Sequence, residues 1–265
     1  MEKILALGRQ EFSTVIGDNC IYIDKTNYIY NLITQGKYYF LSRPRRFGKS
    51  LLANTLKELF LGNKDLFKGL WIYDKWDWEK TYPVIKISFS NIDHIKLGLE
   101  KAIDLKLDKI AKDYDCRLEM NSIATKFQEL IEKLSETAQV VIIIDEYDKP
   151  IIDYLDDLDK AEENREILKN FYSILKDADS YLRFFFVTGV SKFSRVSIFS
   201  DLNNLVDITT DEKFAQIVGW NIEEVNKYFP DYIESAAKKY KDIYPDIMPE
   251  IEKWYDGYSW DGTSR

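Results

Sequence analysis

The sequence contains few of the residues on which metal centres and nucleophilic enzymes commonly depend. It has two cysteines, Cys20 and Cys116, and a single histidine, His94. The cysteines are far apart and form no CxxC pair, so neither a disulfide framework nor a thiolate zinc site is indicated. One imidazole cannot build a histidine-rich metal centre. Because His94 lies in SNIDHIKLG, among residues that cap helices, we expect it at the surface or in a cap.

Positive charge and long apolar runs are scarce as well. Lys and Arg number 37 against 45 Asp and Glu, which gives a formal net charge of -8. Phosphate neutralisation needs clustered basic side chains, so general adhesion to nucleic acid is not indicated, although a local basic patch remains open. No run approaches the roughly 20 apolar residues that span a bilayer, and the apolar N-terminal stretch lacks a cleavage site. We expect a cytoplasmic protein that does not associate with membranes.

The sequence does contain an alternation of apolar strands with helical segments. At 265 residues, 45% of them hydrophobic, it is long enough for one large domain with a helical appendage. The alternation predicts an α/β fold whose parallel sheet is covered on both faces. We expect strands at 37–41, 84–89, 140–144, 181–187 and 205–208, an edge strand at 20–23, and helices at 25–35, 48–61, 96–113, 122–135 and 161–176. Residues 1–210 would form the core, and 211–265 a helical lid or tail.

The segment SRPRRFGKS, residues 42–50, lies between an expected strand and an expected helix. That position suits a phosphate-binding loop, the Walker A motif, in which Lys49 contacts phosphates and Ser50 contacts Mg²⁺. The general pattern GxxxxGK followed by Ser or Thr has glycine where this sequence has Arg43, so the arginines would make the loop unusually basic. The other interpretation is a solvated basic turn before a helix. The candidate nucleotide-binding residues are Arg43, Pro44, Arg45, Arg46, Phe47, Gly48, Lys49, Ser50 and Leu51.

A second motif, VVIIIDE at residues 140–146, is an apolar strand that ends in two carboxylates. It has the form of a Walker B strand, in which Asp145 would help to hold Mg²⁺ and Glu146 would orient and deprotonate the attacking water. Acidic residues after a strand can instead cap the next helix. The occurrence of both motifs in the required order favours the nucleotide site, with Ser50 and Asp145 as metal candidates and Glu146 and Lys49 as catalytic candidates.

The strand expected at 181–187 ends in TGVSK. In folds of this topology that strand lies between the two motif strands and presents a polar residue to the γ-phosphate. Thr188 is therefore the sensor candidate, with Ser191 as the second choice, although an ordinary turn fits equally well. Lys192 or Arg195 would be able to act as an arginine finger does.

An adenine pocket is one interpretation of the N-terminal segment. The candidates are Phe12, Tyr22, Asp24, Lys25 and Thr26, which precede the first core strand and would fold over the loop. The alternative is a packed edge element in which Asp24 caps the next helix.

Four motifs together resemble the bacterial AAA-ATPase-like family: YIDKTNYI at 22–29, FLSRPRRFGKSLL at 40–52, VIIIDEYDKPI at 141–151 and WYDGYSW at 254–260. The resemblance spans nearly the whole chain, and arginine at the first glycine position is usual in that family. It implies similarity to STAND and archaeal ATPases, a three-layer P-loop fold and sheet order 5-1-4-3-2. Members often continue into a PD-(D/E)xK nuclease-like domain. We expect no nuclease centre here, because no acidic residue stands two positions before Lys253.

These observations predict an Mg²⁺-dependent ATP-binding protein that hydrolyses ATP. The reaction would be coupled to an unknown partner or to a nuclease-like domain outside this chain. The alternative is a nucleotide-dependent switch, or an interaction protein, with little turnover. A protein partner or a homo-oligomer is compatible with the sequence, which does not indicate binding to nucleic acid.

Overall fold

The fold is built on one parallel sheet. The structure is a computed structural model that describes residues 3–192, 198–200 and 202–255. Its strands are β1 (Tyr38–Ser42), β2 (Val84–Ser88), β3 (Val140–Asp145), β4 (Leu182–Gly189) and β5 (Val206–Asp207). Their spatial order is β2-β3-β4-β1-β5, and every pairing is parallel. This is the predicted order 5-1-4-3-2, which is confirmed.

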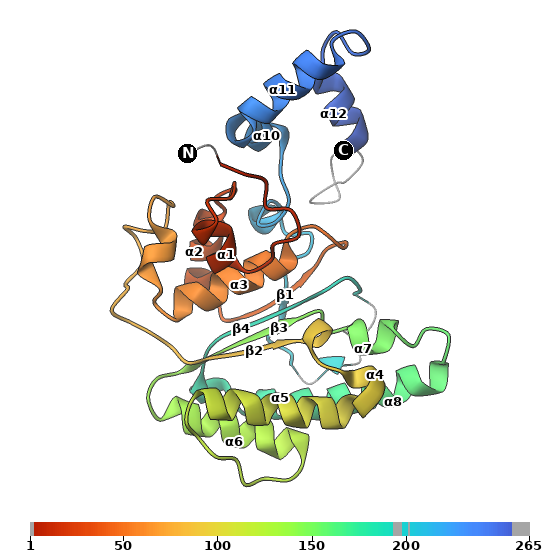
Figure 1. Ribbon diagram of the computed structural model, residues 1–265. Helices are drawn as coiled ribbons and strands as arrows, with labels where there is room; N and C mark the ends of the chain where they lie inside the picture. Colours follow the sequence, from red (N-terminus) through yellow and green to blue (C-terminus); the bar gives the residue numbers. More distant parts are fainter. Residues whose placement is uncertain (1–2, 193–197, 201, 256–265) are drawn as a thin grey trace.

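Helices cover both faces of the sheet and make three layers (Figure 1). One face carries α1 (Phe12–Gly17), α2 (Thr26–Gln35) and α3 (Lys49–Phe60), and the other carries α5 (Leu99–Asp113), α6 (Ile123–Ser135) and α8 (Leu158–Ser173). Single-turn helices connect them: η1 (Lys64–Phe67), η2 (Phe89–Asn91), η3 (Ile174–Lys176), η4 (Asp179–Tyr181) and η5 (Glu212–Phe214). Because both faces are covered, β1 and β3 are buried at every position and consist largely of apolar residues.

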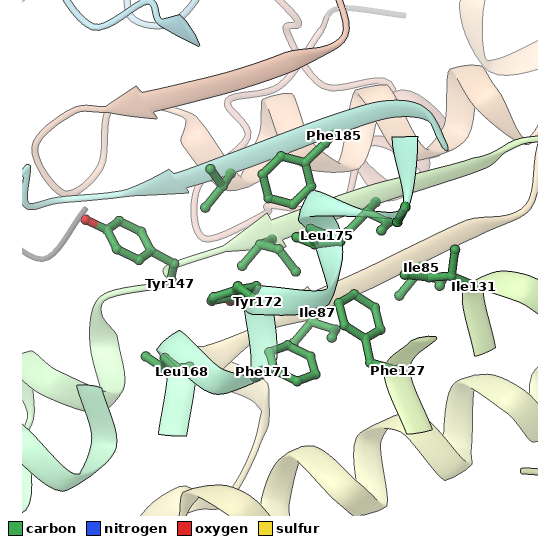
Figure 2. Packing of buried hydrophobic residues seen from close by; sticks show 14 of the residues in the cluster. Ile85, Ile87, Phe127, Ile131, Tyr147, Leu168, Phe171, Tyr172, Leu175 and Phe185 are labelled. Carbon is green, nitrogen blue, oxygen red and sulfur yellow. The ribbon is translucent and has the colours of Figure 1, made fainter. Parts of the chain in front are cut away.

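The layer between the sheet and α5, α6 and α8 holds a continuous apolar cluster (Figure 2). Ile85 and Ile87 of β2 face Phe127 of α6 and Phe171 of α8 in this cluster. The rings of Phe127 and Phe171 stack with their centroids 4.5 Å apart. Full burial of such side chains stabilises a fold by about 1.5–3 kcal/mol each, so this layer is a main source of stability.

Three expectations from the sequence require correction. The helix expected at 96–113 is divided at Gly98, whose φ of 78° ends α4 (His94–Leu97) before α5 begins. The edge strand expected at 20–23 is reduced to an isolated bridge between Ile4 and Cys20. His94 is not at the surface: it is 3% exposed, and its Nε2 lies 3.1 Å from Oδ2 of Asp153. Asp93 caps α4 through the N–H of Lys96, which places His94 in the buried first turn.

Three helices follow the sheet: α10 (Ile222–Tyr228), α11 (Pro230–Tyr240) and α12 (Met248–Tyr255). They lie beyond α1 and α2, away from the sheet (Figure 1). Glu224 of α10 forms an ion pair with Lys25, and the Tyr228 hydroxyl accepts a hydrogen bond from the Asp24 N–H at 3.3 Å. These contacts join the C-terminal helices to the segment before α2. Within the described part of the chain, every helix is too short or too polar to cross a bilayer.

Candidate functional site

The strands bring the predicted motifs together at one end of the sheet. Asp145, the last residue of β3, pairs with Thr188 of β4 and with Ser88 of β2. Ser42, the last residue of β1, pairs with Gly189. The carboxyl ends of four neighbouring strands therefore form a single edge, the place where open α/β sheets bind ligands.

The loop from Arg43 to Gly48 has a backbone shape suited to anions. Arg46 and Gly48 adopt positive φ angles of 69° and 86°. Alternation of right- and left-handed residues turns successive N–H groups toward one concave side, where they bind negative charge. Gly48 precedes α3 and has no side chain with which to cap it, so the N–H groups of the first turn remain available to a ligand.

Lys49, at the start of α3, is buried and bound by its own loop. Its Nζ donates to the carbonyl oxygens of Arg43 and Pro44, both at 2.8 Å. Burial lowers the pKa of Lys49, and the carboxylates of Asp145 and Glu146 oppose that shift. The ammonium is therefore placed among the motif carboxylates, and a phosphate would have to replace the two carbonyls as its partner.

Arg43 does not contribute its charge to the loop as the sequence suggested. Its side chain is 2% exposed, and the guanidinium donates to the carbonyls of Thr209 and, at 3.2 Å, Ala215. The expected basic character is carried instead by Arg45 and Arg46, which are both exposed. Arg43 thus links the loop to the segment that follows β5, and only its main chain faces the candidate site.

Asp145 is a buried carboxylate suited to a hard cation. It is 2% exposed, and its Oδ1 has no hydrogen-bond partner among the described residues. Burial raises the pKa of Asp145, whereas a hydrogen bond from Ser50 and the charges of Lys86 and Lys49 lower it. An orphaned carboxylate oxygen beside a hydroxyl is the oxygen donor set that Mg²⁺ takes when phosphates and waters complete its shell. The residues present fit the ion.

Glu146 lies next to Asp145 in a strained backbone conformation. Its φ is 54°, a region in which residues other than glycine are uncommon. Burial, and next the charge of Asp145, raise the pKa of the Glu146 carboxyl. Glu146 also lines a cavity of about 210 Å³ together with Arg45, Ser90, Asp148, Lys149, Ile152 and Val190. A half-buried carboxylate of raised proton affinity at such a cavity is able to accept a proton from water.

The sensor candidate Thr188 is at the predicted position but is engaged within the sheet. It is fully buried, and its Oγ1 donates to the carbonyl of Leu41 at 2.8 Å. The sensor contact would require this bond to break. Ser191, the second choice, is half-buried, and its N–H donates to the Asp148 carboxylate at 2.6 Å.

Asp148 is a residue whose importance the sequence interpretation missed. It is 1% exposed, and its Oδ2 also accepts the N–H of Val190 at 2.9 Å. Burial raises the pKa of Asp148, and these two N–H groups oppose the shift. Asp148 therefore joins the turn after β3 to the turn after β4. Its position three residues after Asp145, on a short turn between motif and helix, was the available signal.

The N-terminal segment is the packed element that was the alternative to an adenine pocket. Phe12 and Tyr22 pack edge to face in the core with centroids 5.0 Å apart, and Thr26 is fully buried. Asp24 accepts the Thr26 N–H at 2.9 Å and the Trp71 N–H at 2.7 Å. Asp24 thus caps the start of α2, as the alternative interpretation predicted. Lys25 forms an ion pair with Glu224.

Of the two finger candidates, the structure describes Lys192. Lys192 is exposed, with its Nζ 3.7 Å from the Asp207 carboxylate. Arg195 and residues 256–260 of the WYDGYSW motif lie outside the described residues.

A comparison of this sequence with known proteins points to the same kind of site. Residues 6–199 match the AAA-ATPase-like family, described as predicted AAA-ATPase. The chain is also 41% identical over 268 residues to an Azotobacter chroococcum mcd 1 protein described as an uncharacterized protein in the vnfD 5′ region. That alignment covers 99% of this chain and 50% of the relative, so the chain spans about half the relative's length. The chain belongs to the AAA-ATPase-like family of predicted ATPases.

Proposed function

We propose that this protein binds ATP at residues 43–51 and hydrolyses it in an Mg²⁺-dependent reaction. The observation that carries the proposal is the convergence of three features on one sheet edge. They are the loop around Lys49, the buried carboxylate of Asp145 and the half-buried carboxylate of Glu146. Family membership supports nucleotide binding, and the arrangement of these residues supports hydrolysis.

The loop would hold the phosphates through main-chain N–H groups. The positive φ angles of Arg46 and Gly48 favour a concave arrangement of the N–H groups from Arg45 to Gly48, and the N–H groups of Lys49, Ser50 and Leu51 belong to the first turn of α3. The Lys49 ammonium would leave the carbonyls of Arg43 and Pro44 and bind phosphate oxygens. Exposed Arg45 and Arg46 add positive charge at the mouth of the loop.

Ser50 and Asp145 would hold Mg²⁺, which when bound neutralises charge that develops on the phosphates. Ser50 already donates to the Asp145 carboxylate, so the two side chains are close enough to share one ion. Glu146 would orient the attacking water and take its proton, with the proton ending on the Glu146 carboxyl. Thr188 would contact the γ-phosphate after its hydroxyl leaves Leu41.

The test is ATP binding and phosphate release with Mg²⁺, measured on wild type and on Glu146→Gln. The substitution removes the proton acceptor but keeps the size of the side chain. We expect turnover to fall by about 10²–10⁴-fold, the usual contribution of a general base, with ATP affinity little changed. Lys49→Ala should abolish binding. Wild-type turnover that survives in Glu146→Gln would remove Glu146 from the mechanism.

A nucleotide-dependent switch with little turnover is the second candidate. The observation that favours it is the link from Arg43 to the carbonyls of Thr209 and Ala215, because loop movement would be transmitted to the segment that leads to α10. In that case wild type binds ATP without measurable phosphate release, and protease protection of residues 211–255 changes with ATP. A protein partner, self-association, a cytoplasmic location and coupling to a nuclease-like domain beyond this chain belong to the same proposal.

A further inference from the structure

A cavity of about 530 Å³ lies along the edge of the sheet at β2, and its lining includes no residue of the loop at 43–48. The strand at this edge is β2, and among the described residues its one strand partner is β3. The helices α3 and α5 cover opposite faces of the sheet on either side of β2 (Figure 1). Both helices contribute side chains to the cavity, so its walls come from two layers and its floor from the edge strand.

The cavity is basic although the protein as a whole carries a formal charge of -8. Four lysines and two exposed carboxylates line it: Lys57 of α3, Lys86 of β2, Lys106 and Lys109 of α5, Glu11 and Asp113. Within the described residues, Lys106 and Lys109 form no ion pair. Burial and the neighbouring charges of Lys109, Lys86 and Lys57 lower the pKa of Lys106. This crowding of like charge favours the arrival of anionic groups.

The main chain of β2 also has free hydrogen-bonding capacity on this side. The Pro83 carbonyl accepts a hydrogen bond from the N–H of Val141 in β3. Because main-chain groups alternate in direction along a strand, the N–H and carbonyl groups of Val84, Lys86 and Ser88 point away from β3. The Tyr114 hydroxyl contacts both the N–H and the carbonyl of Val84, at 2.7 and 3.2 Å, as a neighbouring strand would. In the described part of the chain, the outward N–H and carbonyl of Lys86 have no such partner.

We propose that this edge binds an acidic peptide segment in extended conformation, which pairs with β2 at Lys86 and places carboxylates beside Lys106 and Lys109 of α5. An added strand uses both a donor and an acceptor of the edge, which a phosphate cannot do. Alternate side chains of a strand share one face, so a peptide with Glu at every second position presents its carboxylates together to the wall formed by α5, which carries Lys106 and Lys109. The carboxylates of Glu11 and Asp113 oppose a continuous polyanion such as nucleic acid.

The test is fluorescence anisotropy with a labelled peptide of alternating Glu and Val, without nucleotide. Wild type should bind it, and the double variant Lys106→Glu/Lys109→Glu should bind at least about tenfold more weakly, since two attractive contacts become repulsive. The matched control is Lys112→Glu, an exposed lysine of the same helix outside this cavity, which should bind like wild type. Equal binding by the double variant and wild type would overturn the proposal.

A second probe tests strand pairing itself. The same peptide with methyl groups on alternate main-chain nitrogens keeps its charge but loses donors to β2, and its binding should be lost. Undiminished binding of the methylated peptide, or stronger binding of a polyphosphate of equal charge, would show an anion patch and no strand addition. No binding of any probe would show that the lysines only protect the edge from pairing, as charged side chains on edge strands do.

This proposal is independent of the nucleotide site. Lys49→Ala, expected to abolish ATP binding, should bind the peptide like wild type. Failure of one proposal therefore leaves the other intact.

Discussion

The interior has two parts that are stabilised in opposite ways. Between the sheet and α5, α6 and α8, apolar side chains such as Phe127 and Phe171 stack in regular elements. At the carboxyl ends of the strands, Arg43, Lys49 and Asp145 are buried with their charges. Burial of charge opposes folding unless partners compensate it. The apolar layer therefore supplies most of the folding free energy. Part of that free energy offsets the cost of burying charged groups at the carboxyl ends of the strands, where they are positioned for a ligand.

The largest effect should come from the apolar layer. Phe127→Ala removes a fully buried ring that stacks on Phe171 and should lower the free energy of unfolding by about 3–5 kcal/mol. Urea unfolding measures this change. Nucleotide affinity of the folded protein should stay the same, because Phe127 lies on the far side of the sheet from α3. A parallel loss of affinity would mean that the two parts are coupled.

The next largest effect on stability should come from Arg43, the buried arginine of the loop. Arg43→Gly restores the general loop pattern but removes the guanidinium bonds to Thr209 and Ala215. We expect a loss of about 2–3 kcal/mol in the free energy of unfolding, typical for hydrogen bonds of a charged group. Arg45→Gly, at an exposed position, is the control and should change stability by less than about 1 kcal/mol. Equal losses of stability in the two variants would show that the hydrogen bonds from Arg43 to Thr209 and Ala215 do not stabilise the fold.

A smaller effect concerns the pH dependence of the unliganded protein. Burial raises the pKa of Asp145 in the folded state above its ordinary value of 3.8. The folded protein then binds more protons than the unfolded chain above about pH 4, so the Asp145 contribution to stability falls as pH rises through that window. Asp145→Asn should remove this contribution and stabilise the unliganded protein at neutral pH.

The difference in free energy of unfolding between wild type and Asp145→Asn, measured from about pH 3 to neutral pH, reports Asp145 together with the effect of its charge on Glu146 and Lys49. It should grow with pH and then level off. A difference that is constant with pH would show that Asp145 has the same proton affinity folded and unfolded.

The smallest effect on stability should come from relief of the backbone strain at Glu146. Asparagine tolerates the left-handed region better than glutamate, so Glu146→Asn should raise the free energy of unfolding by about 0.5–1 kcal/mol while abolishing turnover. Glu146→Gln, which retains a long side chain at the same φ, is the matched control and should gain less. Thermal unfolding of the two variants side by side measures the difference. No difference would mean that the turn is not strained.

The fold and the location of the site followed from local patterns, whereas the roles of several residues did not. Strand β3 was predictable because a run of β-branched residues admits only a buried strand, and it ends at Asp145. The role of Arg43 depends on carbonyls 166 and 172 residues away in the sequence. The partner of His94 is likewise distant, at Asp153. Such contacts are set by packing of whole elements, and no local pattern encodes them.

The two carbonyls that hold Lys49 have a kinetic consequence. Since the Lys49 ammonium already has the carbonyls of Arg43 and Pro44 as partners, a phosphate can bind it only as these two hydrogen bonds break. We expect association in two steps, with an observed rate that levels off at the rate of this exchange of partners as nucleotide concentration rises. Because this exchange of partners involves the phosphates and not the base, we expect nucleotides that bind at the loop to share one limiting rate.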